Sequence, residues 1–141
     1  MVALFRANGN RGYCGGTLVS SKYVISAAHC VEDTKPSEIK AGESFFFKSG
    51  IESIFDIQVR IGDHDFNTVG EGSLPEMTID VTSITNHEDF IYAKNGNDIA
   101  ILELAEEVDL TTYTPACMAK TSDTTTFDGK NAWAYGEIMM I

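Results

Sequence analysis

Short apolar runs separated by glycine and asparagine clusters recur along the whole chain. In "MTIDVTSITNH" (77–87), Met77, Ile79 and Val81 alternate with polar residues, which is the period of a half-buried strand. By contrast, "IAILEL" is almost continuously apolar and indicates a strand that is buried on both faces. Turn signals such as "ANGNRGY", "SLPE" and "KNGND" separate the runs. The pattern predicts an all-β antiparallel barrel or sandwich, with candidate strands at 1–6, 16–20, 23–27, 55–62, 77–87, 98–104 and 131–137.

Composition narrows the class of protein. The 141 residues are 43% hydrophobic, which suffices for one domain with a packed core. The formal net charge is −11, and nucleic-acid-binding proteins usually carry a basic face, so we expect no nucleic-acid partner. No run of 18 apolar residues occurs, so we expect no membrane span. The opening "MVALFRANGN" lacks the apolar core and cleavage signature of a signal peptide.

Three cysteines are present, and their spacing favours one bridge. Cys14 and Cys30 bracket two candidate strands joined by a tight turn at 20–22. A hairpin of that length brings its ends together, so a disulfide is geometrically easy and would contribute roughly 3 kcal/mol. It would hold Ala28 and His29 against the sheet, with the imidazole at a strand end. Such a bridge requires an oxidising compartment.

Four segments carry a family resemblance. "CGGTLVSSKYVISAAHC" resembles the histidine motif of the chymotrypsin-like (trypsin-like) serine proteases, and "NDIAILEL" resembles their aspartate motif. "VRIGDHDF" is similar to a strand and loop between those motifs, and "TYTPACM" to the segment that links the two barrels of the family. The four occur in the family's order. The resemblance implies the first Greek-key barrel of the double-barrel fold at about 1–110, with the linker and the first strand of the second barrel at about 111–141.

The resemblance also implies roles for two side chains. His29 matches the general base that takes the proton of an attacking serine hydroxyl. Asp98, 69 residues later, matches the carboxylate that orients the imidazole, and its oxygens are expected to accept backbone N–H groups of Ala28 and His29. The spacing is longer than the family norm, and the surplus falls in 31–54.

Two metal hypotheses remain beside this one. The segment 62–76 falls where many family members hold calcium, and it offers carboxylate ligands, although a solvated acidic loop is the simpler interpretation. These carboxylates are Asp63, Asp65, Glu71 and Glu76. A zinc site that gathers Cys14, His29, Cys30 and His87 is disfavoured because no typical ligand spacing is present. We therefore expect no required cofactor.

The nucleophilic part of a serine protease is missing from the pattern. No "GDSGG" segment occurs among the 141 residues, so the serine, the oxyanion hole and the substrate pocket have no match. We therefore expect the chain to be inactive alone and to represent about half of a protease domain. Its implied partners are protein or peptide substrates, the missing second barrel and a prosegment linked through Cys117. The parent protein is expected to be secreted.

Three hypotheses of function follow. The first is a trypsin-like serine endopeptidase, which the presence of both His29 and Asp98 favours. The second is a non-catalytic protease homologue that acts as a binding or cofactor protein. The third is an acidic calcium-binding β module. The face that carries His29 and Asp98 would be exposed without a second barrel, and this predicts self-association.

Overall fold

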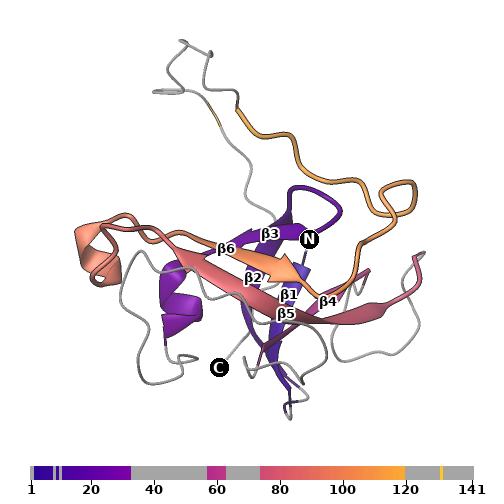
Figure 1. Cartoon of the computed structure of the whole chain (residues 1–141), viewed down its shortest axis with the longest axis horizontal. Helices are drawn as coiled ribbons and strands as arrows, with labels where there is room; N and C mark the ends of the chain where they lie inside the picture. Colours follow the sequence, from indigo (N-terminus) through magenta and orange to yellow (C-terminus); the bar gives the residue numbers. More distant parts are fainter. Residues whose placement is uncertain are drawn as a thin grey trace.

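A computed structural model describes residues 2–7, 9, 11–32, 57–62, 74–119 and 131 of the chain. Six strands and two short 3₁₀ helices account for the regular structure of this part (Figure 1). The strands are β1 (Val2–Arg6), β2 (Gly12–Leu18), β3 (Tyr23–Ser26), β4 (Ile57–Ile61), β5 (Met77–Asn86) and β6 (Ala100–Leu104). The 3₁₀ helices are η1 (Ala28–Cys30), which follows β3, and η3 (Ala93–Asn95), which precedes β6.

The six strands close into one antiparallel barrel, in the spatial order β1-β2-β3-β6-β5-β4. The consecutive strands β4, β5 and β6 form a meander, and β3 lies beside β6, so the connection from β3 to β4 crosses over. This is a Greek-key arrangement, and barrel closure gives each of the six described strands a neighbour on both sides. The predicted all-β Greek-key barrel is confirmed.

Inward-facing side chains fill the barrel. In β4 the residues alternate strictly, so that Ile57, Val59 and Ile61 are buried and the residues between them are half-buried. The ten-residue β5 buries Ile79 and Val81 in the same way, and its register with β6 shifts between Val81 and Ser83. A bulge of this kind bends a long strand so that it serves both sides of a barrel. The alternation read from 77–87 is therefore confirmed.

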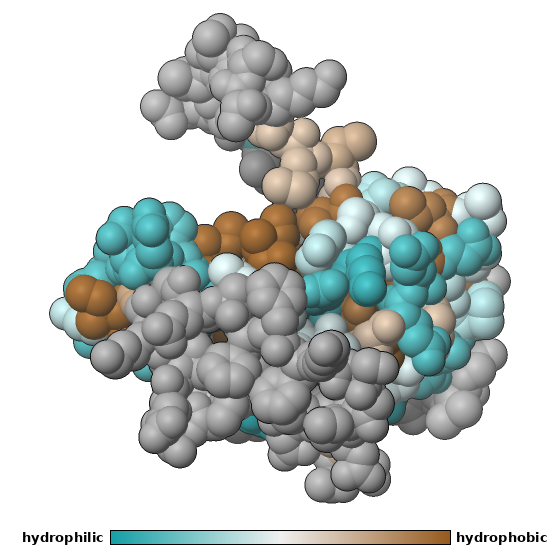
Figure 2. Space-filling model, in the orientation of Figure 1, coloured by the Kyte–Doolittle hydropathy of each residue, from teal (hydrophilic) through white to brown (hydrophobic). Residues whose placement is uncertain are grey.

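The strand at the end of the aspartate motif differs from its prediction. β6 was expected to be buried on both faces, but its residues alternate between buried and accessible positions. Leu102 is fully buried, whereas Ile101 is 45% exposed on the outer face. Figure 2 shows apolar surface gathered over β3 and β6, to which the exposed Ile99 and Ile101 contribute.

The strand limits also differ in detail from the prediction. β2 begins at Gly12, four residues earlier than expected, because Gly12 and Cys14–Gly16 pair with β1. Gly16 has no room for a side chain, since a Cβ there would lie 2.8 Å from Val24 Cγ1 of β3 and 3.3 Å from Leu4 Cδ1 of β1. The candidate strand at 131–137 lies outside the described residues except for Asn131.

The chain after β6 is hydrogen-bonded to the barrel at two points. Val108 N–H donates to Ser21 O at 2.7 Å, and Ala116 N–H donates to Leu18 O at 2.8 Å. Between them, Tyr113 is buried in the core cluster and its hydroxyl donates to Pro75 O. The first two contacts hold 108–116 against the β2–β3 hairpin, and the third links Tyr113 to the segment before β5. Within the described part of the chain, no helix has the length and apolar character needed to cross a membrane.

Candidate active site

His29 lies where the chain leaves β3 and turns. Ala27 is still extended (φ −81°, ψ 142°), and the 3₁₀ turn Ala28–Cys30 follows, closed by Cys30 N–H donating to Ala27 O at 3.1 Å. Ala28 is fully buried, so the turn is anchored on its inner side by a residue small enough to fit. The side chain of His29 projects outward and is 54% exposed. A small inward residue and a large outward one thus place the imidazole at the rim of the barrel.

The register between β3 and β6 brings Asp98 to the same place. Ser26 pairs with Ala100 in antiparallel fashion, so residues just after 26 lie beside residues just before 100. The chain approaches β6 through Gly96 (φ 81°) and Asn97 (φ 56°), both in the left-handed region. Glycine and asparagine tolerate that region best. This turn directs the Asp98 carboxylate at His29.

The two residues are joined at two points. Asp98 Oδ1 accepts the backbone N–H of His29 at 2.9 Å, and Oδ2 lies 2.7 Å from Nδ1 of the ring. The backbone hydrogen bond from His29, followed by its side-chain hydrogen bond, lowers the pKa of Asp98 below its usual value, with a small contribution from Ala28 N–H. The carboxylate is therefore ionised at neutral pH.

This contact determines the tautomer of the neutral ring. An ionised carboxylate can only accept hydrogen bonds, so Nδ1 must carry the proton that faces Oδ2. The lone pair of the neutral imidazole is then at Nε2, on the side away from Asp98. Nε2 lies 3.6 Å from Cys30 Sγ. The ring is thus held at two points, and its accepting nitrogen faces away from the Asp98 carboxylate.

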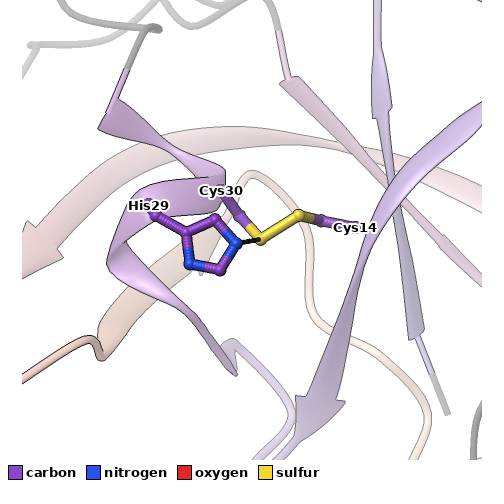
Figure 3. A group of neighbouring side chains, drawn as sticks. All are labelled: Cys14, His29 and Cys30. Atoms are coloured by element: carbon purple, nitrogen blue, oxygen red, sulfur yellow. Dashed lines mark hydrogen bonds between the residues drawn. A yellow bond between two sulfur atoms is a disulfide. The ribbon is translucent and has the colours of Figure 1, made fainter. Parts of the chain in front are cut away.

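A disulfide supports the histidine turn from the other side. Cys14 of β2 and Cys30 of η1 are bonded, with their Cα atoms 6.1 Å apart (Figure 3). Figure 3 shows the His29 ring beside this bridge, with one ring nitrogen directed at the Cys30 sulfur. The expected bridge between the ends of the β2–β3 hairpin is confirmed. Cys117, the remaining cysteine, is exposed and free.

A hydrogen bond that the sequence did not predict secures the base of this hairpin. The buried Ser26 Oγ donates to Gly15 O at 2.8 Å and thereby links β3 to the residue after Cys14. The sole sequence signal for this bond is a small polar residue inside an apolar strand. In the hairpin turn, Ser20 Oγ accepts the backbone N–H groups of Lys22 and Tyr23. In both cases the hydroxyl is occupied in holding the hairpin.

Of the four predicted calcium ligands, only Glu76 is among the described residues. Asp63, Asp65 and Glu71 lie outside the described residues. The carboxylate of Glu76 lies 3.0 Å from Arg60 Nε in an ion pair between the segment before β5 and strand β4. Calcium would have to compete with that guanidinium for one of its four ligands. His87 accepts the backbone N–H of Asp89 at 3.1 Å and takes no part in the site around His29.

Fold and site together define a class of protein: a closed antiparallel barrel whose rim holds a histidine oriented by a distant aspartate and clasped by a disulfide. Comparison with known proteins agrees with this class. The family model described as Trypsin matches residues 1–137. The chain belongs to this family of trypsin-like serine proteases.

Individual relatives match over most of the chain. It is 34% identical over 106 residues to the proclotting enzyme of Tachypleus tridentatus, covering 74% of this chain and 25% of that protein. It is 31% identical over 145 residues to serine protease ea of Drosophila melanogaster, covering 92% of this chain and 33% of that one. The relatives include one named an inactive CLIP domain-containing serine protease A28, from Anopheles gambiae, at 29% identity over 126 residues.

A solved structure shares the fold. The secreted serine protease VesC of Vibrio cholerae matches with a TM-score of 0.55 and 32% identity, over 76% of this chain and 18% of that one. The chain thus spans between a quarter and a third of the first two curated relatives.

Proposed function

We propose that this chain contributes the histidine–aspartate half of the catalytic site of a serine endopeptidase. The observation that carries the proposal is the two-point attachment of His29 to Asp98, through the backbone N–H at 2.9 Å and Nδ1 at 2.7 Å. A purely structural histidine at a barrel rim has no need of both contacts. Two bonds to one carboxylate fix the position and the tautomer of the ring together.

In the proposed reaction, His29 Nε2 accepts the proton of a serine hydroxyl as its oxygen attacks a peptide carbonyl. Asp98 holds the proton on Nδ1 and stabilises the imidazolium that forms. The ring then returns its proton to the leaving amine. Its exposed position at the rim, 54% accessible, leaves room for a nucleophile and a substrate to approach Nε2.

In this proposal the nucleophile comes from residues other than these 141, because no serine of the chain stands in a "GDSGG" segment. We infer that the oxyanion hole and the substrate pocket come from the same source, a second barrel. The 141-residue chain alone is then inactive, since the members of a triad act as a unit and removal of the nucleophile abolishes most of the rate. Secretion of the parent and a prosegment attached through the exposed Cys117 belong to the same proposal.

A second candidate is a non-catalytic protease homologue, and one observation favours it: a relative at 29% identity is named inactive. Such a protein would keep the barrel as a binding scaffold. The two candidates differ in whether a nucleophilic serine accompanies His29 and Asp98.

The test begins with the transcript, read beyond codon 141 for a "GDSGG" segment. The extended protein is then expressed and assayed on peptide amides, beside His29→Ala, Asp98→Asn and the control His87→Ala. Asp98→Asn is expected to lower kcat about 10⁴-fold, the loss typical of a triad with the wrong tautomer. An extended protein that cleaves equally well without His29, or one that has no serine, would refute the endopeptidase proposal.

A further inference from the structure

Three potential metal ligands meet at the rim of the barrel. The Sγ atoms of Cys14 and Cys30 and a ring nitrogen of His29 all lie within 4.8 Å of one another (Figure 3). His29 Nε2 is 3.6 Å from Cys30 Sγ. In the oxidised protein the two sulfurs are bonded to each other and have no thiolate to offer. The same three atoms acquire different chemistry once that bond is broken.

We propose that reduction of the Cys14–Cys30 disulfide converts this cluster into a zinc site of the Cys₂His type, with His29 Nε2 as its nitrogen ligand. The site differs from the four-residue set considered from the sequence, because the cluster found among the described residues contains Cys14, His29 and Cys30 and not His87. The fourth position is left for water. Zinc sites with three protein ligands and one open position are a known arrangement of this metal.

The reaction balances with a dithiol as reductant. The dithiol gives two electrons and two protons to the Cys14–Cys30 disulfide, which becomes two cysteine thiols. The dithiol is itself oxidised to a cyclic disulfide. Zinc(II) then binds both sulfurs as thiolates and releases their two protons to solvent. The neutral His29 ring contributes the Nε2 lone pair and loses no proton, because its proton is on Nδ1.

The distances suit a tetrahedral ion. With Zn–S near 2.3 Å and Zn–N near 2.0 Å, ligand atoms of a tetrahedron lie about 3.5 Å apart for S and N, and about 3.8 Å for two sulfurs. The Nε2–Sγ separation of 3.6 Å is already close to the first value. The sulfurs must move apart from bonding distance, and a Cα–Cα separation of 6.1 Å allows both to turn toward a shared ion.

The second shell of such a site is already in place. Histidines that bind metals usually donate their other ring N–H to a carboxylate, which fixes the tautomer and makes the ligand more basic. His29 donates Nδ1–H to Asp98 Oδ2 at 2.7 Å, so Nε2 is presented to the sulfurs as a metal ligand would be. The ring is 54% exposed, which gives the ion a route from solvent.

The consequence for activity rests on the proposed function. An ion on Nε2 occupies the lone pair that would accept the serine proton, so reduction and zinc together would disable the base. The zinc site itself depends only on the geometry of residues 14, 29, 30 and 98. Its test therefore uses metal binding, and it can fail or succeed whether or not the parent protein is a protease.

The test uses the 141-residue chain with Cys117→Ser, which removes the third thiol from every sample. The protein is reduced with a dithiol, freed of it, and titrated with cobalt(II) and then zinc(II). We expect thiolate-to-cobalt absorption in the reduced protein, its loss on adding zinc, and no such band in the oxidised protein. Two variants measure how much the ligand and its orienting carboxylate contribute to zinc affinity: His29→Gln removes the ring, and Asp98→Asn removes the carboxylate charge. Asp98→Asn should weaken zinc binding about 10- to 100-fold, and His29→Gln at least as much.

His87→Gln is the matched control and should leave zinc affinity unchanged. Because reduction also removes the bridge, circular dichroism is recorded before and after metal addition. A reduced chain that loses its fold should regain it with zinc, since a ligand that binds only the folded state stabilises it. Absence of a thiolate–cobalt band overturns the proposal. So does a His29→Gln affinity equal to that of the parent, or a reduced, unfolded chain that zinc does not restore.

Discussion

The stability contributed by the Cys14–Cys30 bridge follows from its place in the sequence. The two cysteines are 16 residues apart, and the bridge closes the β2–β3 hairpin together with η1. In the loop-entropy relation, a closed loop of this length removes about 10 cal/mol/K from the unfolded chain, or about 3 kcal/mol at 25 °C. The expected loss on breaking it is about 150-fold in the folding equilibrium constant, and about 10 °C in Tm for a chain of this size.

The perturbation is the double variant Cys14→Ala/Cys30→Ala. It is compared with a parent that keeps both cysteines, and both proteins also carry Cys117→Ser. Cys30 is buried and Cys14 is half-buried, so removal of the two sulfurs adds a small packing loss to the entropy change. The dithiol-reduced parent separates the two contributions, because it keeps both sulfurs and loses only the bond. This measurement is made with a chelator present, so that no metal occupies the thiols.

The assay is urea unfolding followed by far-ultraviolet circular dichroism, with the slope m reported beside the midpoint. We expect the free energy of unfolding to fall by about 3 kcal/mol in the reduced parent and slightly more in the double variant. A loss below about 1 kcal/mol in both would refute the reasoning, since the unfolded chain would then gain little freedom from the open loop. A bridged protein less stable than the reduced one would refute it more strongly.

Further predictions concern stability at acidic pH, the barrel core, the backbone at Gly62 and the outer face of β6. The pKa of Asp98 is lowered in the folded protein, so its contribution to stability is present above about pH 3.9 and is lost as the pH falls through the folded value. Asp98→Asn should therefore flatten the acidic part of the curve of unfolding free energy against pH, and an unchanged curve would contradict this. Leu102→Ala, at a fully buried position, should cost about 2–5 kcal/mol in urea unfolding, whereas Ile101→Ala on the outer face of the same strand should cost less than about 0.5 kcal/mol; equal losses would show that the alternation in β6 is wrong. Gly62→Ala should cost about 1–3 kcal/mol, because φ is +88° and the added Cβ meets Pro75 O and lies 3.1 Å from Tyr113 Cε1. A Tm that does not fall in thermal unfolding would contradict this prediction. Ile101→Lys should reduce any self-association of the isolated chain in sedimentation, and a parent that sediments as a monomer would remove the basis for this expectation.

Much of the barrel could be predicted from local pattern. The period-2 alternation of β5 was visible in the sequence because polar residues occupy the outward positions there, and β4 alternates in the same way. In β6 the same alternation was hidden, because the outward position at Ile101 is apolar too. The hydrophobic pattern indicates which side chains can be buried. Which of them are buried depends on the residues that surround them in the folded protein. The apolar outer position is therefore a surface feature that the pattern read as core.

The candidate site shows the same division. The residue types at 14, 29, 30 and 98, and their order, could be read from the motifs, and so could the bridge, since a hairpin of that length brings its ends together. The support from Ser26 Oγ to Gly15 O could not, because it depends on which carbonyl lies opposite a serine across the pairing of β2 and β3. The ion pair of Glu76 with Arg60 was missed for a similar reason: two residues 16 positions apart meet only through the pairing of β4 with β5.

By itself, the sequence determined the chemistry available to this protein: an imidazole, a carboxylate and a pair of thiols, set among strands that alternate well enough to form a barrel. The tertiary structure decided the geometry of that chemistry. The Ser26–Ala100 register and the left-handed turn at Gly96 and Asn97 bring a carboxylate to a ring 69 residues away and orient its proton. Hydrogen bonds act over about 3 Å, and a distance of that size between remote residues exists only once the barrel has closed.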